Sequence, residues 1–278
     1  MDWDLTITSK PKLLNLNLRE LIRYRDLVLM FFLRDFTTTY KQTILGPLWH
    51  IINPLCSTLV YAFLFSGIAG IGTDGIPSLL FYYGGTILWS YFSTCLNTAS
   101  GIFLANAGVF GKVYFPRLVV PIATTFSAML RMLIQFAMLM IFLTYYILTG
   151  SPVRPNWMAF LFPLMIIWLG ALGTGLGMIL SALTTKYRDL NHVLGLALQL
   201  MMYVTPVVYP LSQIPQRFRL LFYINPVSAP MELFRIWFYG AGEVSHKMIM
   251  VSLAVTGVVL LSGLVLFNRN ERTCMDVI

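Results

Sequence analysis

The chain has 278 residues, of which 58% are hydrophobic and only 11% are charged, and its formal net charge at pH 7 is +8. Charged residues make up about a quarter of an average soluble domain, so this composition excludes an ordinary soluble protein and indicates an integral membrane protein. The basic residues lie in short connections between apolar segments, which argues against a nucleic-acid partner. Three cysteines without paired spacing, Cys56, Cys95 and Cys274, support neither a disulfide framework nor a metal site.

Residues 1–43 are expected to form a cytoplasmic N-terminus that contains one amphipathic helix. Its apolar run, Leu27 to Leu33, is far shorter than the roughly 20 residues that a spanning helix needs. Arg25 alone interrupts the apolar stripe of this helix, so we expect the helix to lie along the membrane surface. The stripe consists of Leu18, Leu21, Ile22, Val28, Leu29, Phe32, Leu33 and Phe36.

Residues 44–268 are expected to form a membrane domain with six spanning helices. The predicted spans are 48–68, 79–104, 118–148, 157–183, 191–208 and 248–267. The fourth carries GALGTGLG, whose small residues favour close helix packing. Between the last two spans, four prolines divide residues 209–242 into apolar pieces of about ten residues, which are typical of re-entrant or interfacial periplasmic helices. Residues 269–278 are then a cytoplasmic tail, and the fold class is an all-α membrane protein with one transmembrane domain, residues 1–278.

The distribution of basic residues supports six spans with both termini in the cytoplasm. Cytoplasmic loops of membrane proteins carry an excess of Lys and Arg. The expected inner segments hold Lys10, Lys12, Arg19, Arg23, Arg25, Arg34, Lys41, Lys112, Arg117, Lys186, Arg188, Arg269 and Arg272. The expected outer segments hold only Arg154, Arg217, Arg219, Arg235 and Lys247.

No catalytic motif is recognisable in the sequence. Gly108 to Lys112 has the wrong spacing for a nucleotide-binding Walker A loop, and no Ser or Thr follows the lysine. A Ser/His/Asp grouping and a metal-ligand cluster are also missing from the sequence pattern. We therefore expect no catalytic residue, no metal and no cofactor in this chain.

Three charged residues stand out in the apolar part of the chain. Arg131 lies about thirteen residues into the third predicted span, or roughly 20 Å along it. Such a charge faces either a structural partner or a water-filled path. Glu232 and Arg235 are three residues apart on a short predicted helix and can form a local ion pair.

Several short motifs, in order along nearly the whole chain, resemble one family. These motifs are Tyr24-Arg-Asp-Leu27, YKQTILGPLW from Tyr40 to Trp49, KVYFPR from Lys112 to Arg117, Tyr187-Arg-Asp189, TPVVYP from Thr205 to Pro210, Asn225-Pro226, and Glu232-Leu-Phe-Arg235. In these motifs the sequence is similar to the permease subunits of bacterial ABC transporters that export O-antigen, capsule or teichoic acid.

This resemblance implies a homodimer in the bacterial inner membrane, with two copies of a separate ATPase that binds ATP and Mg²⁺. The exported substrate would be an undecaprenyl-linked polysaccharide. The implied ATPase-coupling residues are Arg19, Arg23, Arg25, Lys112, Tyr114 and Arg117. Candidates for the substrate channel are Trp49, Tyr61, Tyr82, Trp89, Arg131 and Tyr203, although many of these aromatic residues fit interfacial belts equally well. Candidates for a periplasmic gate are Tyr209, Glu232 and Arg235.

Two other functional classes remain open from the sequence. An ABC permease for drugs or small lipids could share the fold. A membrane-bound glycan-modifying enzyme would need acid/base or metal residues clustered at one membrane face, and the sequence shows no such cluster.

Overall fold

The computed structural model describes residues 22–41, 45–110, 115–187 and 189–273, and within these ranges it is helical with no strand. The long helices match the predicted spans closely. They are α3 (Trp49–Tyr61) continued by the π-helical η2 (Ala62–Ile68), α4 (Ser78–Ser100), α7 (Val119–Leu148), η3 (Trp157–Leu161) with α8 (Phe162–Lys186), α9 (Leu190–Tyr203) and α12 (His246–Thr273). The all-helical fold class is therefore confirmed.

Four helical stretches within the described residues are long and apolar enough to cross a membrane: 49–68, 119–148, 157–186 and 246–269. α4 is long enough at 23 residues but is not among these four, and most of its residues are buried inside the protein. α9 is apolar but has only 14 residues. It ends at Tyr203, five residues before the predicted end, because Pro206 disfavours helical backbone at Thr205 and cannot donate a backbone hydrogen bond.

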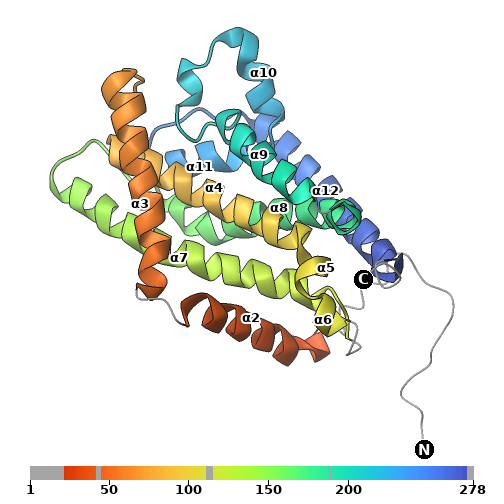
Figure 1. Ribbon diagram of the computed structural model, residues 1–278. Helices are drawn as coiled ribbons and strands as arrows, with labels where there is room; N and C mark the ends of the chain where they lie inside the picture. The colour runs from red at the N-terminus through yellow and green to blue at the C-terminus, as the bar shows by residue number, and fades with distance from the viewer. Residues whose placement is uncertain (1–21, 42–44, 111–114, 188, 274–278) are drawn as a thin grey trace, which may run out of the picture.

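The helices form a bundle built around α4 and α8 (Figure 1). α8 packs on α4 and α12, and α7 packs on α4, whereas α3 crosses α4 and buries few of its own residues. The main hydrophobic core lies between α4, α7 and α8, where the rings of Phe136 and Phe162 stack 4.1 Å apart.

Glycines of α8 permit the close approach that GALGTGLG predicts. A Cβ at Gly177 would lie 2.5 Å from the Leu96 carbonyl oxygen of α4, and one at Gly173 would lie 2.7 Å from the Phe92 carbonyl oxygen. On α12, a Cβ at Gly263 would lie 2.5 Å from the carbonyl oxygen of Gly175. The expectation of close packing through small residues is confirmed at both helix contacts.

Residues 204–245 form short helices at one end of the bundle (Figure 1): η4 (Leu211–Gln213), α10 (Gln216–Ile224) and α11 (Ser228–Tyr239). Pro215 immediately precedes α10, Pro226 separates α10 from α11, and Pro230 occupies the first turn of α11, where a missing N–H costs nothing. Pro215 and Pro226 therefore divide this segment as the sequence predicts, whereas Pro230 lies within α11 and does not.

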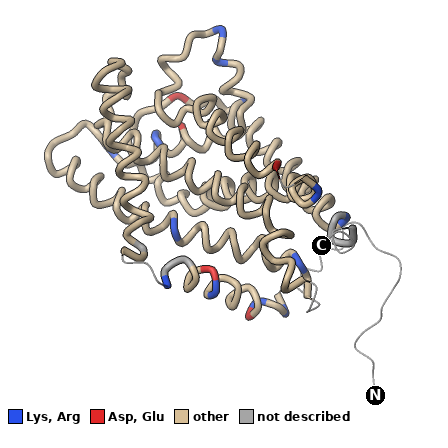
Figure 2. Tube along the Cα trace, viewed as in Figure 1, with Lys and Arg blue, Asp and Glu red and all other residues tan. Residues whose placement is uncertain are grey.

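The N-terminal helix α2 (Arg25–Tyr40) lies along the edge of the bundle against α7, close to the short helices α5 (Ile102–Ala105) and α6 (Ala107–Phe110) (Figure 1). A 3₁₀ turn, η1 (Gly46–Leu48), leads from it into α3. Charged residues gather along α2, at α10 and near the end of α12, and few lie between these regions (Figure 2).

Candidate functional site

An aromatic contact joins α2 to the segment before α7. The ring centroid of Phe31 lies 5.7 Å from that of Phe115, which in turn lies 5.7 Å from that of Phe110. Phe31 is only 7% exposed, whereas Leu29 and Leu33 of the predicted apolar stripe are exposed. The predicted stripe therefore leaves apolar residues open to lipid, whereas Phe31, outside that stripe, is buried and packs on protein.

A polar contact lies beside this aromatic one. Nη2 of Arg34 donates hydrogen bonds to Oδ1 of Asp35 at 2.9 Å and to Oδ1 of Asn106 at 3.2 Å. The amide of Asn106 also donates to the carbonyl oxygen of Ile102 at 3.0 Å, so Asn106 joins α2 to α5. We call Phe31, Arg34, Asn106, Phe110 and Phe115 the α2 contact.

The predicted coupling residues fall into three groups. Arg23 and Arg25 are exposed, and the Arg25 side chain is 81% accessible. Arg117 is only 8% exposed, with its guanidinium 5.3 Å from the ring centroid of Phe110, so it holds the α2 contact together and is not presented at the surface. Arg19, Lys112 and Tyr114 lie outside the residues that the structure describes. The sequence did not single out Phe31 or Asn106, because neither carries a motif.

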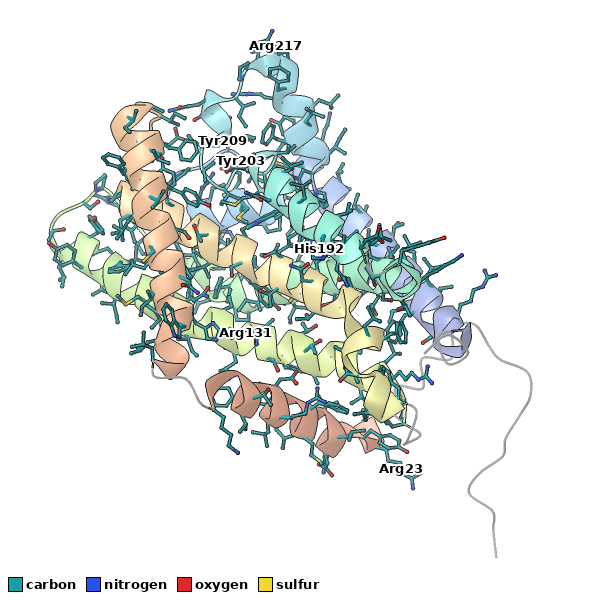
Figure 3. All side chains as sticks on the ribbon, in the orientation of Figure 1. Arg23, Arg131, His192, Tyr203, Tyr209 and Arg217 are labelled. Carbon is teal, nitrogen blue, oxygen red and sulfur yellow. The ribbon has the colours of Figure 1, made fainter. Side chains whose placement is uncertain are left out.

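The six channel candidates do not share one surface. Tyr82 and Trp89 of α4 are buried in the main core. Trp49 is exposed at the start of α3, and Tyr61 of α3 lies near α9, where its hydroxyl contacts Sδ of Met202 at 3.8 Å. The next residue of α9, Tyr203, is exposed (Figure 3). Only Tyr61 and Tyr203 are therefore brought together, on the side where α3 and α9 leave apolar residues uncovered.

Arg131 lies on α7 beside the base of α3 (Figure 3). It lines a cavity of about 120 Å³ together with His50, which is the second residue of α3. Arg131 is the thirteenth of the 30 residues of α7, so it lies roughly 20 Å along the helix, and the preceding turns of α7 run beside α2. Arg131 is level with the start of the first long span.

Arg235 and Glu232 of α11 form a buried ion pair. Nη1 of Arg235 lies 2.5 Å from Oε1 of Glu232, and the two side chains are 3% and 1% exposed. Nη2 of Arg235 donates to the carbonyl oxygen of Pro206 at 2.5 Å, and the guanidinium lies 3.9 Å from the ring centroid of Phe81 on α4. Oε2 of Glu232 accepts a hydrogen bond from the backbone N–H of Glu243 at 3.1 Å.

This group, which we call the Arg235 junction, joins α4, the segment after α9, α11 and the loop before α12. Burial raises the pKa of the Glu232 carboxyl above its ordinary value, and the Arg235 guanidinium opposes that shift. The local pairing that the i, i+3 spacing predicts is present. Both side chains are inaccessible within the described part of the chain, and their contacts link residues 204–245 to α4.

Two further contacts fix this segment, the first between two of its motifs and the second between α11 and α4. Nδ2 of Asn225 donates to Oγ1 of Thr205 at 2.8 Å, and the hydroxyl of Tyr239 donates to the carbonyl oxygen of Leu80 at 2.8 Å. Motifs about twenty residues apart in the sequence thus meet in one cluster.

Tyr209, the third gate candidate, occupies a different place. Its hydroxyl donates to the carbonyl oxygen of Tyr203. Both tyrosines line a mainly apolar cavity of about 450 Å³ between α9 and α10, together with Phe218 and Phe222 (Figure 3). The three gate candidates therefore form a buried pair and a separate aromatic pocket.

No group of three or more potential metal ligands occurs among the described residues. The features that the structure presents are an interface helix, a fixed cap of short helices and a small polar cavity. These features suit a membrane protein that transports other molecules or binds partner proteins.

Comparison with known proteins identifies the family. The family model described as "ABC-2 type transporter" matches residues 26–239. The O-antigen export system permease protein RfbA of Klebsiella pneumoniae is 30% identical over 255 residues, covering 91% of this chain and 95% of the relative. Its namesake in Myxococcus xanthus is 27% identical over 256 residues, with 91% and 96% covered. The polysialic acid transport protein KpsM of Escherichia coli is 27% identical over 249 residues, with 88% and 93% covered. The chain belongs to the ABC-2 type transporter family of integral membrane permeases.

Proposed function

We propose that this chain is the membrane subunit of an ATP-driven exporter that moves a lipid-linked polysaccharide across the bacterial inner membrane. The observation that carries the proposal is the match, over about nine-tenths of the chain, to permeases whose names specify O-antigen export or polysialic acid transport. ATP and Mg²⁺ are bound by a separate ATPase, two copies of which associate with two copies of this chain.

The α2 contact is the proposed route by which the ATPase drives the permease. α2 and the segment around α5 and α6 lie at the same end of the bundle, and the contact between Phe31 and Phe115 fixes them to one another. A partner that pushes on one of them therefore displaces both. Arg23 and Arg25 are the exposed cations that would meet this partner.

α3 and α9 form the proposed channel wall in the homodimer. In the apolar span formed by α3 and η2, only 11% of the residues are buried within the protein, and α9 buries only Leu198 and Met202. Two copies facing each other across these helices would enclose a path into which Tyr61 and Tyr203 project. Aromatic rings provide flat apolar faces that suit sugar rings as well as lipid.

The proposed topology has six spans, with α4 and α9 added to the four apolar stretches and both termini in the cytoplasm. α4 needs little apolar surface of its own because neighbouring helices cover it. α9 has only 14 residues, and the residues that follow it, including Pro206, continue the chain to the outer side, where the Arg235 junction fixes them. The cap of η4, α10 and α11 then lies on the periplasmic side.

Deletion of the gene tests this proposal. A strain that lacks the chain should lose a surface polysaccharide and accumulate its lipid-linked precursor inside, and the wild-type gene should restore export. A tagged copy should co-purify with an ATPase. Normal surface polysaccharide combined with new sensitivity to small toxic molecules would contradict the proposal and favour a drug or small-lipid permease.

A further inference from the structure

The small cavity beside Arg131 is lined mainly by polar side chains. Its lining includes Arg131 and Gln135 of α7, His50 of α3, and Ser90, Tyr91 and Thr94 of α4. These side chains present a guanidinium, an amide, an imidazole and three hydroxyls. All of these groups donate hydrogen bonds, so the cavity offers both positive charge and donors to a ligand.

The position of the cavity along α7 places it at the depth of the membrane surface. Phe126, Met129 and Leu133 of α7 line a groove against α2, whereas Ala128, Arg131 and Gln135 line the polar cavity. At 100° per residue, these two sets lie on opposite faces of the same stretch of α7. The Arg131 cavity is therefore level with α2, the helix that we place at the membrane surface.

His50 gives a second, independent marker of depth. It is the second residue of the first long apolar span, 49–68, and such a span begins where the hydrocarbon layer begins. Both markers place the cavity where lipid headgroups lie.

The size of the cavity restricts its ligand to a small group. Its volume of about 120 Å³ equals that of about four water molecules. A polysaccharide chain does not fit, whereas a single phosphate group, with five heavy atoms, does. Arginine is especially suited to phosphate, because its planar fork of N–H groups can donate two parallel hydrogen bonds.

We propose that the Arg131 cavity binds one phosphate group of a lipid at headgroup depth. Two lipids could supply that group: a membrane phospholipid, or the lipid carrier of the exported glycan. Assignment to the carrier rests on the proposed function, whereas recognition of phosphate does not. A site for the carrier here would hold the lipid end of the substrate beside α3 before the glycan enters the channel.

The test measures binding to the purified full-length chain in detergent by native mass spectrometry and by thermal shift. The probes are farnesyl phosphate, dihexanoyl phosphatidylglycerol and inorganic phosphate, with farnesol as the control that lacks phosphate. We expect Arg131→Gln to weaken binding of at least one phosphate probe by about ten-fold or more, the range for a lost charged hydrogen bond. Arg131→Lys should retain part of the affinity, and farnesol should show no dependence on residue 131.

Matched variants separate recognition from folding. Arg154→Gln removes the same charge at an exposed site beyond the C-terminal end of α7 and should leave phosphate binding unchanged. If Arg131→Gln fails to fold, Thr94→Val keeps the side-chain shape, removes one hydroxyl and should weaken binding about three-fold or more. Melting temperatures measured without ligand identify any variant that is merely destabilised.

The outcomes are distinct. Preference for farnesyl phosphate over phosphatidylglycerol assigns the cavity to the lipid carrier, and the reverse preference assigns it to membrane lipid. Equal binding of all phosphate probes by wild type, Arg131→Gln and Thr94→Val would overturn the proposal, as would equal binding of farnesol and farnesyl phosphate. The assay needs neither ATPase nor export, so it can fail or succeed independently of the deletion experiment.

Discussion

Phe31 on α2 contacts Phe115, which lies 84 positions later in the chain, with ring centroids 5.7 Å apart and planes tilted by 41°. This contact fastens the N-terminal helix to the segment that leads into α7. In the proposed exporter, it transmits the movement of the ATPase to the membrane helices.

Phe31→Ala should loosen α2 from the bundle. Truncation of a buried phenylalanine costs about 3 kcal/mol or more, so the melting temperature should fall. If α2 transmits the movement of the ATPase to the membrane helices, the ATPase of the purified complex should continue to hydrolyse ATP while export per ATP decreases. Leu33→Ala on the exposed side of α2 should change neither the melting temperature nor the export per ATP. Phe31→Leu should restore most of the coupling between ATP hydrolysis and export. Normal export by Phe31→Ala would show that α2 is only an anchor.

Arg235→Met should destabilise the chain strongly. Removal of one partner leaves the Glu232 carboxylate buried without compensation, which costs about 3–5 kcal/mol. The Arg219–Glu243 pair provides the control, because it is partly exposed with atoms 3.6 Å apart, and Arg219→Met should cost less than about 1 kcal/mol. Thermal unfolding in detergent measures both variants.

The Arg235→Met variant should also acquire a pH dependence. Burial already raises the pKa of Glu232 above 4.5, and loss of the guanidinium removes the interaction that opposes this shift. The folded state then binds a proton more tightly than the unfolded state does. Stability is therefore greatest below the unfolded pKa and decreases as pH rises through the folded pKa. The variant should melt at a higher temperature at pH 5 than at pH 8, and a flat profile would show that Glu232 is solvated after the substitution.

Gly177→Ala should disturb the contact between α8 and α4. The added Cβ would meet both the Leu96 carbonyl oxygen and the Ala99 Cβ at 2.5 Å, so the helices must separate at a cost of about 1–3 kcal/mol. Gly257→Ala on α12 meets nothing within 4 Å, and the better helix propensity of alanine should leave that variant as stable or slightly more stable. Equal melting temperatures for the two variants would contradict close packing at Gly177.

Cysteine labelling should test the six-span topology. In a background with all three native cysteines replaced, Asp74→Cys and Arg217→Cys should react with a membrane-impermeant maleimide added to intact spheroplasts. Asp189→Cys, between α8 and α9, should react only after the membrane is permeabilised. All three positions are exposed in the fold, so burial does not limit the reaction. Labelling of both Asp74→Cys and Asp189→Cys from outside would require α4 not to span, and protection of Arg217→Cys with Asp189→Cys still inside would require α9 not to span.

The sequence predicts the helices better than it predicts which faces meet. Span ends agree within a few residues because apolar length and proline positions determine them locally. The predicted apolar stripe of α2 contains Leu29 and Leu33, which are open to lipid, but the pattern does not identify Phe31 as the residue that packs on protein. In a membrane protein, apolar residues cover both lipid-facing and protein-facing surfaces, so periodicity cannot distinguish them.

The candidate site shows the same limit. Tyr82 and Trp89 are channel candidates by residue type, but their helix α4 lies at the centre of the bundle, and this depends on contacts with α7 and α8. The Glu232–Arg235 pair follows from its spacing, whereas its contact with Pro206 depends on the path of the chain between α9 and α11. Local chemistry was predictable, and long-range contacts were not.

The central claim is tested most directly by transport in a reconstituted system. Proteoliposomes that contain this chain and its co-purified ATPase should move a radiolabelled lipid-linked glycan across the bilayer only when ATP and Mg²⁺ are supplied on the ATPase side. Vesicles with either subunit alone should move none. Translocation of the glycan by this chain without an ATPase, or no translocation by the complete complex with ATP, would contradict the account.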